Sequence, residues 1–200
     1  MNNDVERVLT FWFGTLDAQG RATPEVRTRW FKKDTAFDQE IRDQFLSFYH
    51  QATQGQLSNW LTTQRGRLAL IIVLDQFSRN MFRGTPQMYT ADAQAVSTAN
   101  TAFECGDESV CAFAERGFLY LPLMHSELLV DQQQCIERFM AFREELPDDQ
   151  KSAVDQNIDY AIRHRDIVAR FGRFPHRNEI VGRESTPEEV EFLKEPGSSF

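Results

Sequence analysis

The chain has no long apolar run and no C-x-x-C motif, and we expect no signal peptide from its first residues. The longest apolar run, Leu68–Leu74, is far shorter than the roughly 20 residues that cross a bilayer. Cys105, Cys111 and Cys135 form no C-x-x-C pair, and scattered thiols are typical of a reducing compartment. The first residues also lack the basic start and apolar stretch of a signal peptide. We therefore expect a cytoplasmic protein that does not span a membrane.

Several motifs that would carry chemistry are also missing. There is no G-x-S-x-G motif and no glycine-rich phosphate loop. Three histidines and one acidic residue would satisfy a zinc or iron site, and the candidates are His125, His164, His176 and either Glu127 or Asp75. However, no H-E-x-x-H, H-x-x-x-H or E-x-x-H spacing occurs, and nearby arginines would repel a cation. We expect no metal and no cofactor.

Positive charge is scarce except in one region. The chain has 22 Lys and Arg against 30 Asp and Glu, a formal charge of −8, which argues against nonspecific binding to nucleic acid. From Tyr160 to Arg183, however, six arginines stand against Asp166 and Glu179, a local charge of +4. This region contains the segment F-G-R-F-P-H-R-N. Concentrated positive charge on an acidic chain indicates either a site for an anion or carboxylate, or a hub of ion pairs.

Strand alternation is also scarce, and apolar residues recur with the period of a helix almost throughout. The β-branched residues of Leu68–Leu74 leave a strand open there, but its helical neighbours favour a buried helix within Arg67–Asn80. The pattern predicts an all-α protein of about eight to ten helices, packed as antiparallel pairs in a single domain over residues 1–200. Seventeen phenylalanines supply apolar volume for its core. Residues 195–200 are expected to form a frayed tail.

Helix ends are marked by capping and breaking residues. Gly172 is expected to end a long helix, because glycine accepts the left-handed conformation that follows many helices. The segment Ser185–Val190 combines a cap, a first-turn proline and acidic residues, and predicts a short helix. Pro122 is expected to interrupt a helix that starts near Ser109.

Two further helix starts are predicted from acidic or hydroxyl side chains. Thr90 or Asp92 is expected to cap a helix that ends near Gly106. Asp148 or Asp149 is expected to cap the long helix that Gly172 ends.

Three polar-rich segments are candidates for a site. In Leu74–Arg83, Asp75 and Arg79 are four residues apart and share a helix face. Either these two form an internal ion pair, or Arg79 and Asn80 line a pocket. In Tyr120–Glu127, Ser126 caps a helix with Glu127 in its first turn, or His125 and Glu127 converge on an anion. In the third segment, His164–Asn178, cations offset a helix dipole, but four arginines and two histidines exceed that need.

Together these segments resemble the DUF924 family of uncharacterised bacterial proteins. The resemblance covers nearly the whole chain through F-W-F-G, L-D-Q-F-S-R-N, L-P-L-M-H-S-E, R-F-G-R-F-P-H-R-N and V-G-R-E-S-T-P-E-E. Ser78 stands where proline is expected and Val181 where leucine is usual, and neither change removes a polar group. The resemblance implies a tetratricopeptide-like right-handed superhelix and no established activity, so it carries over no catalytic residue.

The leading hypothesis is a helical binding domain with a polar pocket for a small anion or a peptide carboxylate. Its predicted lining is Arg79, Asn80, His125, Glu127, His164, Arg173, His176, Arg177 and Asn178. One alternative is a hydrolase-like or transferase-like enzyme with His125 or His176 as general base and Glu127 as the orienting carboxylate. Another is a purely structural network of buried ion pairs. The oligomeric state stays open.

Overall fold

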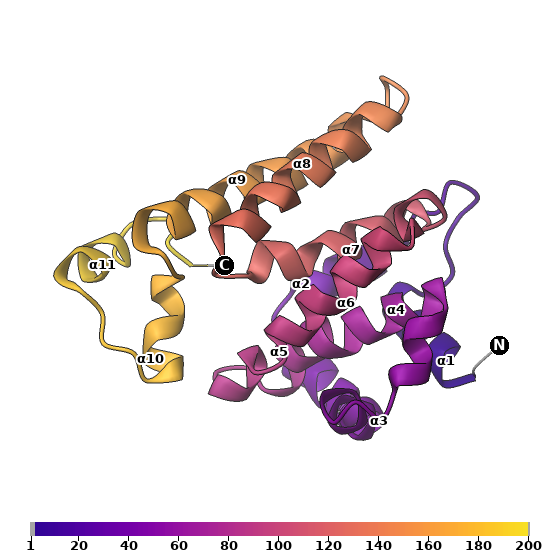
Figure 1. Cartoon of the computed structure of the whole chain (residues 1–200), viewed down its shortest axis with the longest axis horizontal. Helices are drawn as coiled ribbons and strands as arrows, with labels where there is room; N and C mark the ends of the chain where they lie inside the picture. Colours follow the sequence, from indigo (N-terminus) through magenta and orange to yellow (C-terminus); the bar gives the residue numbers. More distant parts are fainter. Residues whose placement is uncertain (1–2, 200) are drawn as a thin grey trace. The chain divides into compact units, whose positions relative to one another are not determined.

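A computed structural model describes residues 3–199, and every regular element within that range is helical. Figure 1 shows the order of the helices along the chain. A π-helical turn joins α4 to α5, so these two form one continuous helix. Counted in this way, the described residues contain ten α-helices. The all-α fold class is thus confirmed, whereas the tetratricopeptide-like superhelix stays a prediction. No helix in residues 3–199 is both long enough and apolar enough to cross a membrane.

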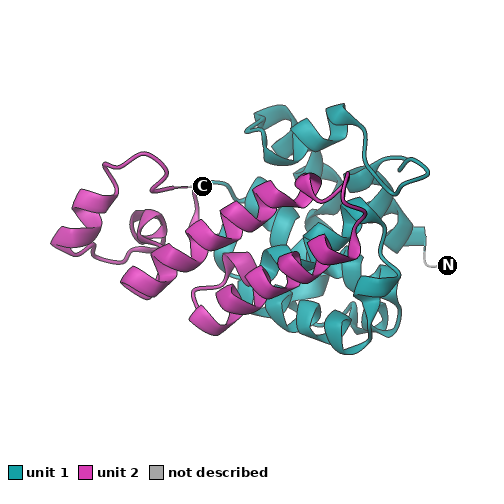
Figure 2. Ribbon diagram, turned by 90° about the horizontal axis from the view of Figure 1, so that it is seen from above, with its two compact units in different colours: residues 1–83, 87–122 teal, residues 84–86, 123–200 magenta. Residues whose placement is uncertain are grey.

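The chain divides into two compact units (Figure 2). Unit 1 contains residues up to 83 and residues 87–122, and unit 2 contains residues 84–86 and those from 123 onward. The single domain over residues 1–200 stays a prediction. Helix α7 (Phe113–His125) contributes to both units.

Unit 1 is built around buried aromatic rings. Its other helices are α1 (Asn3–Phe13), α2 (Pro24–Phe31), α3 (Thr35–Thr53), α4 (Gln64–Ile71), α5 (Ser78–Met81) and α6 (Asp92–Glu104). Trp12 and Phe77 are fully buried, with ring centroids 5.6 Å apart in an edge-to-face arrangement. Phe45 lies 4.7 Å from Phe77 and joins α3 to the same core. Burial of these rings supplies much of the apolar area that stabilises the unit.

The segment between α4 and α5 is helical, as predicted, despite its β-branched residues. A π-helical turn spans Ile72–Phe77, and all its residues are buried. The Ser78 hydroxyl donates to the carbonyl oxygens of Leu74 and Asp75, at 2.7 and 3.0 Å. These bonds satisfy acceptors in the region where the helical repeat changes. The strand alternative is therefore wrong, because a helix buried on all sides tolerates the modest helix propensity of Ile and Val.

Unit 2 contains a long antiparallel hairpin of α8 (Leu129–Glu145) and α9 (Ser152–Phe171), seen side by side in Figures 1 and 2. Gly172 ends α9 with φ of 69°, the left-handed conformation that was predicted for it. Two short helices follow, α10 (Asn178–Val181) and α11 (Pro187–Phe192). Helix α11 begins with the predicted cap, a reciprocal capping box between Thr186 and Glu189.

Two predicted caps are wrong. Ala91, without a side-chain hydrogen bond, precedes α6, and the Asp92 carboxylate instead accepts from Arg79 at 2.9 Å. Lys151 precedes α9, and Asp148 pairs with it at 3.0 Å. In both cases an acidic side chain binds a basic side chain instead of the backbone N–H groups at the start of a helix. The partner of Asp92 is 13 residues away, whereas that of Asp148 is only three residues away.

The predictions around Pro122 and Ser126 are also wrong. Helix α7 starts at Phe113 and continues through Pro122, although an interior proline removes one helical hydrogen bond and its ring crowds the carbonyl four residues earlier. Helix α8 begins after Leu128, so Ser126 does not cap it and Glu127 lies outside its first turn. The Gln132 side chain instead satisfies the end of α7, because its Nε2 donates to three carbonyl oxygens there at 2.6–3.2 Å.

The C-terminal segment differs from the frayed tail that was expected. Ser198 is buried, and its hydroxyl donates to the carbonyl oxygen of Leu193 at 3.1 Å. Glu195 and Ser198 also make backbone turn hydrogen bonds. The segment is thus anchored as far as Ser198, and residue 200 lies outside the described residues.

Candidate functional site

Three polar side chains lie against the buried ring of Phe174 in unit 2, and a fourth lies beside one of them. The His164 and His176 rings each lie 5.5 Å from it, centroid to centroid, and the Arg177 guanidinium stacks over it at 4.6 Å. His125 lies 6.5 Å from His164. We call Phe174, His125, His164, His176 and Arg177 the Phe174 cluster.

Local backbone geometry brings the cluster together. His164 lies on the last turns of α9, and the left-handed turn at Gly172 reverses the chain after that helix. Pro175 then starts a 3₁₀ turn that ends at Arg177, and its ring fixes φ near the required value. His125, the last residue of α7, supplies its carbonyl oxygen to Arg177 Nη2 at 2.8 Å.

Glu127 connects the cluster to the segment that follows α10. Both of its oxygens accept hydrogen bonds from Arg183, at 2.7 and 2.9 Å, and one also accepts from the backbone N–H of Phe174 at 2.8 Å. Burial alone would raise the pKa of Glu127, but the bonds from Arg183 and Phe174 outweigh burial and lower it. This carboxylate is therefore charged and fixes the backbone at Phe174.

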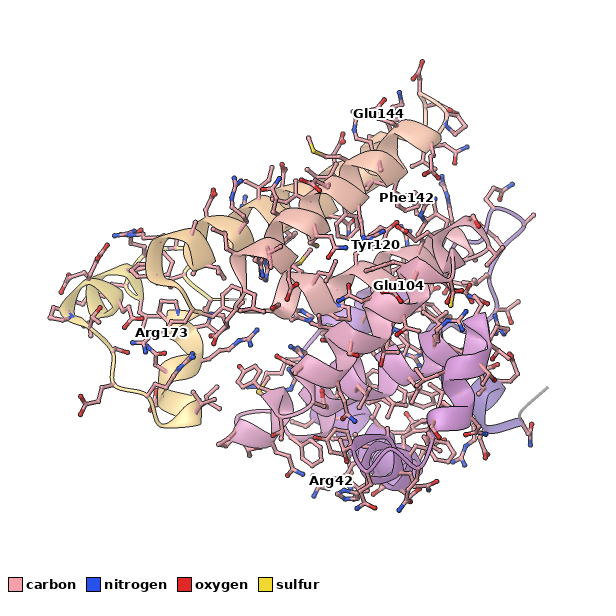
Figure 3. The ribbon with its side chains drawn as sticks, in the orientation of Figure 1. Arg42, Glu104, Tyr120, Phe142, Glu144 and Arg173 are labelled. Atoms are coloured by element: carbon pink, nitrogen blue, oxygen red, sulfur yellow. The ribbon has the colours of Figure 1, made fainter. Side chains whose placement is uncertain are left out.

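Arg173 anchors the other side of the same turn (Figure 3). Its guanidinium binds both oxygens of Glu189 at 2.6 and 2.8 Å and donates to the carbonyl oxygen of Glu184 at 2.9 Å. The Arg173 bond, with help from the backbone of Thr186, lowers the pKa of Glu189 to about 2. Arg173 thus joins the end of α9 to the start of α11.

His164 and His176 are neutral at physiological pH. Burial, together with the nearby His125, His176 and Arg177, lowers the pKa of His164 to about 3, although the hydrogen bond with Tyr160 opposes this. Its Nδ1 donates to the carbonyl oxygen of Tyr160 at 2.7 Å, which defines the tautomer because a carbonyl only accepts. Burial and then Arg177 lower the pKa of His176 to about 4, although Glu127 opposes this. Burial and the charge of Arg177 thus both disfavour protonation of the His164 and His176 rings.

Comparison with known proteins agrees with the motifs in the sequence. The model of a family described as bacterial proteins of unknown function, DUF924, matches residues 8–197. The chain belongs to this family. It is also similar to the solved structure of a protein of unknown function from Agrobacterium tumefaciens, with 37% identity and a TM-score of 0.80 over 96% of this chain and 97% of that one. No curated protein matches.

Arg79 and Asn80, which the sequence placed in the same pocket, lie in unit 1 of this DUF924 chain. Arg79 is 3.0 Å from the buried carboxylate of Asp75 and makes two hydrogen bonds with Asp92, at 2.9 and 3.0 Å. Asn80 donates to Asp38 at 2.7 Å. These contacts match the ion pair that was the alternative to a pocket for this segment. The other predicted residues all lie in unit 2.

Sequence reasoning missed the structural partners of the cluster. Arg183 was counted as part of the local positive charge, yet it forms an ion pair with Glu127. Glu189 was assigned to a helix start, yet it forms an ion pair with Arg173. Asn178, predicted to bind ligand, is buried, and its Nδ2 donates to the Ser185 hydroxyl at 3.1 Å. In the sequence, Arg183 stood among the six arginines of residues 160–183, and Gly182, whose φ is 70°, turns the chain just before it.

The described residues offer no evident metal site. Across residues 3–199, no group of three or more His, Cys, Asp or Glu side chains is arranged to hold a metal ion. The chemistry open to the Phe174 cluster is donation from guanidinium and imidazole N–H groups.

Proposed function

We propose that unit 2 is a binding module for a small anion or a peptide carboxylate, held at the partly exposed edge of the Phe174 cluster. The observation that carries the proposal is that cationic and imidazole groups surround one buried ring, while His125 and His176 remain partly exposed. Guanidinium and imidazole N–H groups are frequent donors to carboxylates and phosphates in proteins.

The electrostatics support the same ligand class. The carboxylates of Glu127 and Glu189 are each held by an arginine, and Arg177 adds a further guanidinium. Burial lowers the pKa of His176 first, and the charge of Arg177 lowers it as well although Glu127 opposes this, so a cation acts on this partly exposed ring. The buried Nε of Arg183 has no hydrogen-bond acceptor among residues 3–199, and such a donor needs a partner.

The enzyme alternative has weaker support. A histidine with a pKa of about 4, such as His176, is a poor proton acceptor at neutral pH, because an efficient general base titrates near the working pH. Glu127, the orienting carboxylate of that hypothesis, already binds Arg183 through both oxygens. We therefore favour binding over catalysis.

The wider setting of the module is also part of the proposal. We propose a tetratricopeptide-like superhelix, which the antiparallel α8–α9 hairpin in unit 2 supports. We propose a cytoplasmic location, because Cys105, Cys111 and Cys135 are all free thiols.

Ligand titrations with three simple probes test the proposal. Inorganic phosphate, acetate and a short N-acetylated peptide with a free carboxylate should each raise the melting temperature of the wild-type protein. They should also shift the imidazole NMR signals of His125 and His176, which are resolvable because the chain has only 4 histidines. The same peptide with an amidated C-terminus should bind at least roughly tenfold more weakly, since a charged hydrogen bond is lost.

Matched variants separate a binding role from a structural one. Arg177→Gln should abolish the ligand response, whereas Arg163→Gln, which removes an exposed arginine of α9, should leave it intact. If Arg177→Gln unfolds the protein, His176→Gln takes its place, because that ring is partly exposed. The proposal is wrong if none of the three probes changes the wild-type melting temperature or the histidine signals.

A further inference from the structure

The start of α8 exposes three consecutive apolar side chains. Leu128, Leu129 and Val130 are 63%, 50% and 70% exposed, and residues 3–199 contain no other run of three large exposed apolar residues. We call these residues the apolar triplet. Exposed apolar side chains are common singly, but a contiguous group of them is a feature of binding surfaces.

The apolar triplet also occupies positions that polar residues normally fill. Leu128 is the residue that precedes the first turn of α8, where Ser, Thr, Asp or Asn would stabilise the helix through a side-chain hydrogen bond. Leu128 makes no such bond. The chain thus gives up a stabilising cap and exposes apolar area at the same place, and neither change benefits the folded protein by itself.

The apolar triplet lies close in the sequence to His125 of the Phe174 cluster. Glu127, which binds the backbone N–H of Phe174, immediately precedes Leu128. Three residues of chain, at most about 10 Å, separate Leu128 from His125. A ligand of a few residues can therefore span both features within unit 2.

We propose that the Phe174 cluster and the apolar triplet form one site for the C-terminal end of a peptide whose last residues are apolar. The carboxylate binds Arg177 and His176, and an apolar side chain packs on Leu128, Leu129 or Val130. This inference rests on the proposed binding function and adds the ligand class. A positively charged group beside an apolar surface complements a chain end that carries one negative charge and an apolar side chain, whereas a free phosphate has no group for the apolar triplet.

Isothermal titration with paired peptides tests this inference. N-acetylated tripeptides that end in leucine should bind the wild-type protein roughly tenfold tighter than those that end in glycine, because the leucine side chain loses contact with water. Leu129→Gln and the nearly isosteric Val130→Thr should reduce this preference while acetate binding remains unchanged. Met140→Gln is the matched control, because Met140 is a 52% exposed apolar residue of the same helix outside the apolar triplet.

Each other outcome contradicts one defined part. If leucine-ended and glycine-ended peptides bind equally well, the apolar triplet is not part of the site and the anion-binding function stands alone. If neither peptides nor phosphate and acetate bind, both proposals are wrong. If the wild-type protein forms dimers in light scattering that Leu129→Gln dissociates, the apolar triplet binds a second copy of the chain and the peptide proposal is overturned.

Discussion

His164 is a buried histidine that the fold keeps neutral. Its ring is buried beside Phe174, and burial favours the uncharged form more strongly than the hydrogen bond from Nδ1 to the carbonyl oxygen of Tyr160 opposes it. Its folded-state pKa of about 3 lies well below the value of about 6.5 for an unfolded histidine. Such a difference links the stability of the protein to pH.

Acidification should therefore destabilise the protein well above the range in which carboxylates titrate. Below about pH 6.5 the unfolded state takes up a proton on His164 that the folded state excludes, so the free energy of unfolding falls as pH falls. From pH 7 to pH 5 the loss from this residue is about 2 kcal/mol, and His176 acts in the same direction. Urea denaturation at several pH values measures it.

The variant His164→Gln should have a smaller pH dependence between pH 7 and 5 than the wild type. His50→Gln, which removes an exposed imidazole of α3, is the control for the loss of a histidine. An unchanged slope in His164→Gln would show that this ring does not titrate as described.

The Glu127–Arg183 pair should contribute measurably to stability. Glu127→Gln removes the charge that accepts from Arg183 and from Phe174, and leaves a partly buried guanidinium with a weaker acceptor. We expect a loss of about 1–2 kcal/mol in chemical denaturation. Glu188→Gln breaks a mostly exposed pair with Arg170 and should cost less than about 0.5 kcal/mol. Equal effects of the two variants would contradict this assignment.

At the scale of elements, the turn at Gly172 positions the three residues of the Phe174 cluster that follow it, Phe174, His176 and Arg177. Its φ of 69° lets the chain leave α9 and return past His164 to Phe174 and His176. Helix ends of this kind were predictable from single residues, because few residues other than glycine adopt that conformation without strain. Helix starts were less predictable, because the carboxylates of Asp92 and Asp148 bind basic side chains instead of capping.

Gly172→Ala should destabilise the protein by about 1 kcal/mol, since alanine is strained at positive φ. Gly117→Ala is the matched control, because Gly117 lies within α7 and nothing lies within 4 Å of an added Cβ. That change should be neutral or stabilising, as alanine has the higher helix propensity. Thermal denaturation followed by circular dichroism compares the two, and the same sign for both variants would refute the prediction.

At the scale of the whole molecule, the three thiols report on folding in both units. Cys105 is exposed, Cys111 is partly buried and Cys135 is buried. Burial raises the pKa of Cys111 to about 12 and raises that of Cys135 as well, which suppresses the reactive thiolate. Of the three thiols, only that of Cys105 is exposed to solvent in the folded protein.

Native protein should therefore react with Ellman's reagent at one thiol in a fast phase, and at all three only after denaturation. Cys105→Ser should abolish the fast phase. A fast phase that survives this substitution would show that unit 1 or unit 2 opens more readily than its packing indicates.

By itself the sequence determined the all-α class, the family, the end of α9 at Gly172 and the start of α11 at Pro187. It also determined the polar segments from which a site could be built. These follow from short-range chemistry: helical periodicity, backbone conformation and local motifs. Only the tertiary structure decided the partners. Glu127 binds Arg183, which is 56 residues away, and Arg79 binds Asp92, which is 13 residues away. Ion pairs of this kind depend on which helices meet after folding, and no local pattern specifies that choice.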